Sequence, residues 1–151
     1  MRAIIQRVSE AKVSVDNEVI GAIGKGLLVL IGIENNDSKV DIEWLCKKII
    51  NQRLFSDQEG KMNKSLIDID GKVLLISQFT LFAQTKKGNR PSFIRAAKPE
   101  IAIPLYNQVL TCLKEQMGTD KVAAGEFGAD MQVSLLNDGP VTIYMDTKNK
   151  E

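Results

Sequence analysis

The chain has 151 residues, 44% of them hydrophobic and 26% charged, which is typical of one globular domain with a sizeable core. Its formal net charge is +1, so any nucleic-acid partner has to be recognised by local clusters of charge. It contains no histidine, which excludes histidine-based catalytic triads and the usual catalytic zinc sites.

The N-terminal residues do not form a secretory signal, and no apolar run approaches the ~20 residues of a membrane span. We therefore expect a cytoplasmic protein without a membrane partner. No segment matches a P-loop, a dinucleotide fingerprint or a metalloprotease helix, and we expect neither a cofactor nor a metal site. Cys46 and Cys112 lack zinc-site spacing and are expected to be small buried hydrophobic residues.

The first half of the chain predicts strands followed by a helix. Apolar runs predict four strands, at residues 2–8, 11–15, 18–23 and 27–33. The last of these is apolar throughout, which is typical of a central strand buried on both faces. Ser38 and Asp41 resemble a capping box at the start of a helix. The apolar side of that helix is predicted to contain Val40, Trp44, Leu45, Ile49 and Leu54.

The second half predicts another core strand, a second helix and three final strands. The core strand is expected at 73–82. Pro99 and Gly118 bound the second helix, in which Pro104 either marks the true first turn or kinks an earlier start. The final strands are expected at 122–127, 131–136 and 141–146.

This order of elements predicts a single α+β domain over residues 1–151. Its sheet should be mixed or mainly antiparallel and barrel-like, with two main helices packed on it. The sequence contains no repeats or linkers, and only the tail at 147–151 is expected to be flexible.

Polar residues appear near the end of the predicted core strand. Ser77, Gln78 and Thr80 follow a purely apolar run, and burying them is costly unless they are hydrogen-bonded or face a cleft. Two interpretations stay open: the strand emerges at the surface there, or its end forms the floor of a pocket. In a pocket, the hydroxyls, the amide and the backbone N–H groups can face a carbonyl oxygen.

The segment Asn137-Asp138-Gly139-Pro140-Val141-Thr142 lies between two predicted strands, and its composition is typical of a turn. A cis Gly139–Pro140 bond would direct the neighbouring carbonyls in an unusual, rigid way, but the sequence leaves the isomer open.

Two further segments each have a structural and a functional interpretation. The run from Lys86 to Lys98 carries five positive residues and no acid. It is interpreted either as a solvated loop or as a surface that binds phosphate. The segment 125–131 places small residues around Phe127, either for core packing or for close approach to a ligand.

Taken together, these segments closely resemble the bacterial and eukaryotic D-aminoacyl-tRNA deacylases. The resemblance covers almost the whole chain, to about Asp146, and rests on residues 1–8, 77–81, 88–93, 125–131 and 137–142.

The resemblance implies hydrolysis of the ester between a D-amino acid and the terminal ribose of tRNA, and removal of glycine from mischarged tRNA. It implies a homodimer with its active site at the subunit interface, and a tRNA partner rather than DNA. Gly139 and Pro140, supported by Arg7, would reach into the partner's pocket as a chirality filter.

The same resemblance implies individual roles. Catalysis is assigned to Thr80, Gln78 and the backbone N–H group of Phe79. Substrate binding is assigned to Ser77, Phe127, Met131, Asn137, Gly139 and Pro140. We expect the tRNA backbone to be contacted by Lys86, Lys87, Arg90 and Arg95.

Two mechanisms stay open. In the preferred one, backbone N–H groups near Phe79 and Thr80 polarise the ester carbonyl and the substrate's own 2′-OH assists attack by water. In the other, Thr80 is a covalent nucleophile, although no histidine is available to activate it. The non-enzymatic alternatives are a tRNA-binding dimeric module that uses the basic run, and a structural dimerisation domain in which residues 137–142 form only an interface hairpin.

Overall fold

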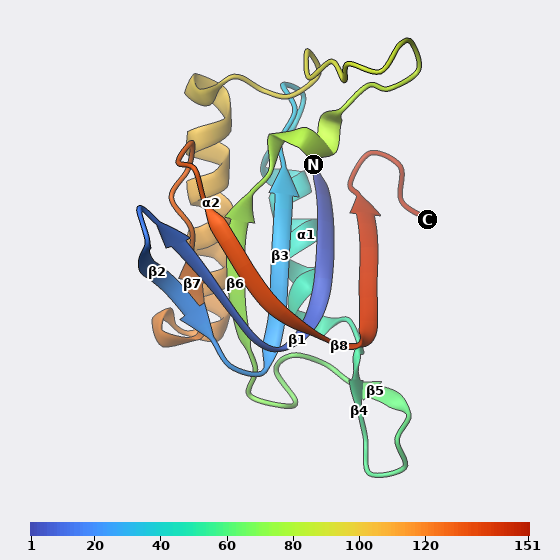
Figure 1. The fold of residues 1–151 in the computed structure, drawn as a ribbon. Helices are drawn as coiled ribbons and strands as arrows, with labels where there is room; N and C mark the ends of the chain where they lie inside the picture. The colour runs from blue at the N-terminus through green and yellow to red at the C-terminus, as the bar shows by residue number, and fades with distance from the viewer.

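Figure 1 shows a mixed β-sheet with two helices on one face, in a computed structural model that describes residues 1–151. The sheet strands are β1 (Arg2–Val15), β2 (Glu18–Ile23), β3 (Gly26–Gly32), β6 (Lys72–Ser77), β7 (Val122–Ala124) and β8 (Gln132–Asp146). The small hairpin consists of β4 (Phe55–Ser56) and β5 (Met62–Lys64). The helices are α1 (Lys39–Asn51) and α2 (Pro99–Met117), with 3-10 turns at Phe79–Phe82 and Thr119–Lys121. Neither helix combines the length and the apolar composition that a membrane span requires.

The main sheet combines antiparallel and parallel pairing. Its order is β2-β1-β3-β6-β7, and β8 pairs with the other edge of β1. β1 is antiparallel to β2, β3 and β8, whereas β3 is parallel to β6 and β6 to β7. In Figure 1 the long strands β1 and β8 cross in front of the central strands, and both helices lie behind them. The predicted α+β fold with a barrel-like mixed sheet is confirmed.

The central strand β3 contributes to an apolar core on each of its faces. Leu27, Val29 and Ile31 pack into the larger cluster, which contains α1 and α2. Leu28 packs into the smaller cluster in front, together with Val13 of β1. This two-sided burial confirms the prediction drawn from the continuous apolar run.

Three predicted strand boundaries are wrong. The pieces at 2–8 and 11–15 form one strand, because β8 pairs with both of them. The strand predicted at 73–82 ends at Ser77, and a 3-10 turn follows. The strand predicted at 122–127 ends at Ala124.

The strands predicted at 131–136 and 141–146 are also one strand, β8. Asn137 is level with Val8, and Thr142 with Gln6, so residues 138–141 bulge outward opposite the single residue Arg7. The expected turn at this place is therefore a bulge inside a continuous strand.

The helices begin where the sequence predicts. The Ser38 N–H donates to the Asp41 carboxylate at 2.9 Å, which completes a capping box for α1. The apolar side of α1 was predicted wrongly at Val40, which is 70% exposed, and at Leu54, which follows the helix. The buried side consists of Ile42, Leu45, Cys46, Ile49 and Ile50, together with the capping Asp41.

The second helix begins at Pro99 and ends before Gly118, which has φ 100°. Pro104 lies inside this helix, so the earlier start is the correct alternative. Cys46 is buried and Cys112 half-buried, and both are free thiols. Burial raises the pKa of Cys46, as expected for a packed thiol rather than a reactive one.

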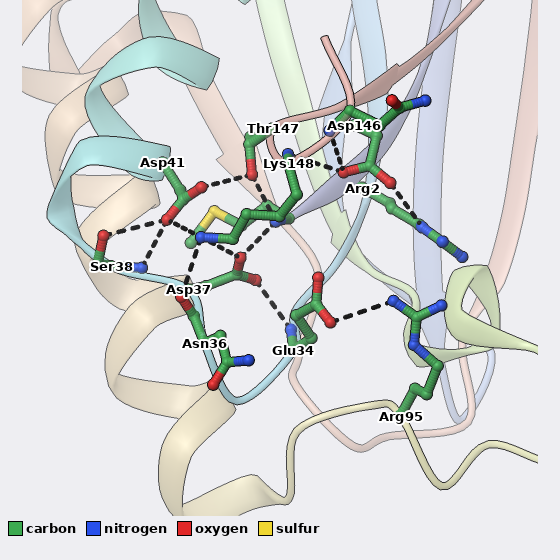
Figure 2. A network of polar contacts seen from close by, with 12 residues as sticks. Arg2, Glu34, Asn36, Asp37, Ser38, Asp41, Arg95, Asp146, Thr147 and Lys148 are labelled. Carbon is green, nitrogen blue, oxygen red and sulfur yellow. Dashed lines mark hydrogen bonds and ion pairs between the residues drawn. The ribbon is translucent and has the colours of Figure 1, made fainter.

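A polar network joins the start of β1 to the end of β8 (Figure 2). The buried amino group of Met1 donates to Asp37 and, at 2.7 Å, to the hydroxyl of Thr147. That hydroxyl donates to Asp41 at 2.6 Å, and the Lys148 ammonium reaches the same carboxylate at 2.7 Å. The tail expected to be flexible therefore begins with two residues that make buried or ionic contacts.

Candidate active site

A cavity of about 270 Å³ opens at the carboxyl ends of β3 and β6. It brings Ser77, Gln78 and Phe79 together with Phe127 and Met131, all of which the sequence proposed as site residues. The remaining lining residues are Ile31, Ile33, Ile76, Ala97, Ala102, Gly128, Ala129 and Val133. The polar end of the predicted core strand thus forms the floor of a pocket, which is the second of the two interpretations that the sequence left open.

The chain turns directly after the residues that form the floor of the cavity. The Gln78 N–H donates to the carbonyl of Ile31 at 2.7 Å, which is the last sheet-like contact before the chain turns. Phe79 and Thr80 are the first two residues of the 3-10 turn, so no carbonyl of the turn accepts from their N–H groups. The N–H groups of Phe79, which lines the cavity, and of Thr80, which follows it but does not line the cavity, therefore have no partner in the turn.

Side chains at the floor form a local hydrogen bond. The side-chain amide of Gln78 donates to the hydroxyl oxygen of Thr80. None of the residues that line the cavity is ionisable, so no carboxylate or amine lies there to act as a general base. The site can polarise and orient a substrate, but its side chains are poorly suited to proton transfer.

The opposite wall is held by α2 and by a close backbone approach. The hydroxyl of Tyr106 donates to the Leu75 carbonyl at 2.9 Å, and burial raises the pKa of Tyr106 to about 12. The ring of Tyr106 packs edge-to-face on Phe127 with centroids 5.8 Å apart. A Cβ on Gly125 would lie 2.5 Å from the sulfur of Met131 and 3.0 Å from the end of the Ile76 side chain, so the glycine lets Met131 pack close to the backbone here.

An aromatic pair stands at the rim. The rings of Phe79 and Phe93 meet edge-to-face at 5.1 Å, and Phe79 is 56% exposed. An exposed aromatic ring beside a pocket is a platform on which a nucleobase can stack.

The basic run lies next to this rim as an exposed loop. Lys86, Lys87 and Arg90 are exposed and make no ion pair in the structure. Arg95 differs from them, because its guanidinium pairs with Glu34 at 3.3 Å (Figure 2). The ion pair with Glu34 helps to hold the loop in place, while part of the Arg95 side chain remains exposed to solvent.

The 138–141 bulge is braced by two neighbours. The Arg7 guanidinium donates to the Asp138 carbonyl at 3.0 Å and to the Leu54 carbonyl at 2.6 Å. The side-chain amide of Asn137 donates to the carbonyls of Arg7 and Val141, at 2.9 and 3.0 Å. Asn137 does not line the cavity, so within one chain it braces the bulge instead of contacting a substrate in the pocket.

The tip of the bulge consists of Gly139 and Pro140, which are exposed and joined by a cis peptide bond. Gly139 has φ 129°, and a Cβ there would lie 2.9 Å from the Arg7 guanidinium. Glycine is therefore the residue that this backbone accommodates without strain.

The bulge and the cavity of one chain do not meet. Ser77 is level with Ile31 and, across β3, with Ala3, whereas the bulge lies opposite Arg7. The step from Ala3 to Arg7 corresponds to roughly 13 Å along a strand. A single chain thus leaves the two main predicted segments apart.

Sequence reasoning missed the residues that contribute only apolar wall or shape, such as Ile33, Ala97 and Ala102. Nothing distinguishes them from core residues in a sequence pattern. Gly128 and Ala129 belong to the segment of small residues for which the sequence offers close approach to a ligand as one interpretation, and both line this cavity.

Comparison with known proteins gives the chain its family. Residues 4–146 match the family model described as D-Tyr-tRNA(Tyr) deacylase. The chain belongs to this family. Proteins of Bacteroides fragilis (strain YCH46) and Bacteroides thetaiotaomicron, both named D-aminoacyl-tRNA deacylase, are 61% and 58% identical to it over the full length of both chains.

Solved structures agree with the D-Tyr-tRNA(Tyr) deacylase fold. One named "c-Myc DNA Unwinding Element Binding Protein" is 43% identical with a TM-score of 0.92, covering 97% of this chain and 98% of that chain. A probable eukaryotic D-amino acid tRNA deacylase, 18% identical, shares the fold with a TM-score of 0.81, over 95% and 97% of the two chains. Family membership confirms the resemblance read from the motifs, and with it the prediction of a hydrolase.

Proposed function

We propose that the chain hydrolyses the ester bond of D-aminoacyl-tRNA, and of mischarged glycyl-tRNA, releasing free tRNA and the amino acid. The observation that carries the proposal is the cavity beside the free N–H groups of Phe79 and Thr80, in a chain of the deacylase family. We assign the reaction to the cytoplasm, where aminoacyl-tRNA is used.

The chemistry of the substrate suits a site without ionisable groups. An aminoacyl ester is already activated, and the neighbouring 2′-OH of its ribose can assist the attacking water. The N–H groups of Phe79 and Thr80 would donate to the ester carbonyl, and more strongly to the oxyanion that forms from it. The reaction then depends on placing donors and reactants rather than on a strong base.

Covalent catalysis by Thr80 is the less favoured mechanism. Its hydroxyl oxygen accepts a hydrogen bond from Gln78, which draws electron density away from a nucleophile. No base lines the cavity to take the hydroxyl proton.

The surroundings of the cavity match the two ends of the substrate. The apolar wall of Phe127 and Met131 suits the aminoacyl group, and the exposed ring of Phe79 suits the terminal base. The exposed cations Lys86, Lys87 and Arg90 suit the phosphates behind it, with a smaller share for the paired Arg95.

Chiral rejection is proposed to come from a second subunit. The rigidly braced tip at Gly139 and Pro140 is exposed and too far from its own cavity, so it is available to a partner's cavity. Main-chain groups placed against the substrate Cα would collide with an L side chain and leave space for hydrogen, so glycine would pass.

The unpaired edge of β8 favours such a homodimer. β8 pairs only with β1, which leaves one long edge free. Its side chains include Leu136, which is 60% exposed, and Leu135, which is 37% exposed. An open, partly apolar edge of this length is normally covered in a stable protein.

The test is release of amino acid from tRNA charged with D-tyrosine, measured in parallel with binding of the same tRNA. We expect ester cleavage well above the spontaneous rate. Salt-sensitive binding without cleavage would instead identify a tRNA-binding module, and absence of both would leave only a dimerisation domain.

A further inference from the structure

The guanidinium of Arg2 connects three distant segments of the chain. Its Nε donates to the Asp146 carboxylate at 3.0 Å, and its Nη1 donates to the Leu81 carbonyl at 3.0 Å. The same group lies 4.7 Å from the centre of the Phe82 ring. Leu81 and Phe82 are the second half of the 3-10 turn whose first half carries the donors at Phe79 and Thr80.

The turn has few bonds of its own. The Leu81 N–H reaches the Gln78 carbonyl at 3.3 Å, and the Ala83 N–H reaches the Thr80 carbonyl at 3.0 Å. A single turn of this kind is too short to be stable by itself, so its position depends on outside contacts. Arg2 supplies a charged donor and a cation–π contact at the end of the turn that faces β1.

Arg2 is itself held in one orientation. The second oxygen of Asp146 accepts the N–H groups of Lys148 and Asn149, at 2.9 and 3.3 Å. Burial alone would raise the pKa of Asp146, but these bonds and Arg2 outweigh it, and the pKa is lowered. Figure 2 shows Asp146 beside the network that fastens the end of β8 to α1. The carboxylate is therefore charged and fixed at neutral pH.

We propose that Arg2 is a positioning residue of the active site, which holds the 79–82 turn so that the N–H groups of Phe79 and Thr80 keep their direction toward the ester carbonyl. This inference rests on the proposed deacylation. Arg2 does not line the cavity and acts only through Leu81 and Phe82.

Three variants test the proposal. Arg2→Met keeps an unbranched side chain but removes the charge and the donors. Arg2→Lys keeps the charge, yet one ammonium lacks the fork that reaches Asp146 and Leu81 together. Lys47→Met removes an exposed cation of α1 that makes no ion pair and serves as the control.

The first measurement is amide hydrogen exchange by NMR, which needs no substrate. In Arg2→Met we expect exchange at Leu81 and Ala83 to be at least about tenfold faster, since a charged hydrogen bond is lost. Arg2→Lys should lie between that variant and the parent chain. Exchange at Leu75 in β6 should not change, which also reports that the variants are folded. Unchanged exchange at Leu81 and Ala83 in Arg2→Met would overturn the proposal.

The second measurement is the single-turnover rate on D-tyrosyl-tRNA over a range of enzyme concentrations. We expect a maximal rate about tenfold to a hundredfold lower in Arg2→Met, with half-saturation little changed, because the lost interaction acts in the transition state. A faster-exchanging turn with an unchanged maximal rate would show that Arg2 holds the turn without positioning the donors, and would also refute the proposal. If the parent chain cleaves no ester at all, the deacylase function fails, while the exchange measurement still decides whether Arg2 fixes the turn.

Discussion

Thr80 carries the only hydroxyl of the 79–82 turn, so its contribution distinguishes the two mechanisms at the scale of one residue. Thr80→Val keeps the side-chain shape and the backbone N–H. We expect it to lower the single-turnover rate on D-tyrosyl-tRNA by less than about tenfold, because the donors that matter are main-chain groups. A loss of several decades with normal tRNA binding would contradict this and identify Thr80 as the nucleophile.

At the scale of an element, the N-terminus of α1 carries a carboxylate that the fold uses as an anchor. Burial alone would raise the pKa of Asp41, but hydrogen bonds from Lys148, Thr147 and Ser38 outweigh it, and the pKa falls below its ordinary value of 3.8. The unfolded chain therefore takes up a proton at this site before the folded chain does. The stability that Asp41 contributes is present above pH 3.8 and is lost as the pH falls through the window beneath it.

Asp41→Asn should consequently lower the free energy of unfolding by about 1–3 kcal/mol at pH 7 and by less at pH 3, because the charge-dependent stability begins to be lost below pH 3.8. Urea unfolding at the two pH values measures this difference. Asp146 also has a lowered pKa, so some acid sensitivity should remain in the variant. Equal losses at both pH values would show that the charge of Asp41 is not what stabilises the end of α1.

Elements were predictable from the sequence where one physical signal dominates. The apolar run of β3 has only one stable location, between two cores, and the capping residues Ser38 and Asp41 define their helix start locally. Boundaries set by distant partners were not predictable. β8 continues through residues 138–141 because β1 pairs on both sides of the bulge, although the local composition is typical of a turn.

In the candidate site, too, residues with a local signal were predictable and residues held by distant partners were not. Ser77 and Gln78 were identifiable because burying polar side chains at the end of an apolar strand is costly unless they are hydrogen-bonded or face a cleft. Arg2 was not, since its partners Leu81 and Asp146 lie far along the chain and a surface arginine is the ordinary expectation. The identity of the substrate was inferred from the family resemblance, because composition and periodicity do not indicate a substrate.

At the scale of the whole molecule, the cavity and the bulge of one chain lie apart. The proposed chirality filter therefore requires two subunits, which can be tested. In Gly139→Ala the added Cβ meets the Arg7 guanidinium and Val141, and φ of 129° is strained for alanine. We expect this variant to cleave L-tyrosyl-tRNA at a rate approaching its rate on the D form. Gly60→Ala, at φ 78° in open space within the β4–β5 hairpin, is the control and should keep full discrimination.

Mixing subunits then decides where the filter acts. Ala129→Phe fills the cavity but leaves the bulge intact, so alone it should be inactive. An excess of this chain, equilibrated with Gly139→Ala, should restore rejection of the L form, because each open cavity then faces an intact bulge from the partner. Unaltered cleavage of the L form in the mixture would place the filter within one chain.

The most direct test of the central claim is the cleavage of D- and L-tyrosyl-tRNA by the same purified chain, with Ala129→Phe as the inactive reference. The structure and the family together predict rapid loss of the D-tyrosyl ester and an L-tyrosyl ester that decays only at its spontaneous rate. Equal cleavage of the two esters, or cleavage of neither, would contradict it.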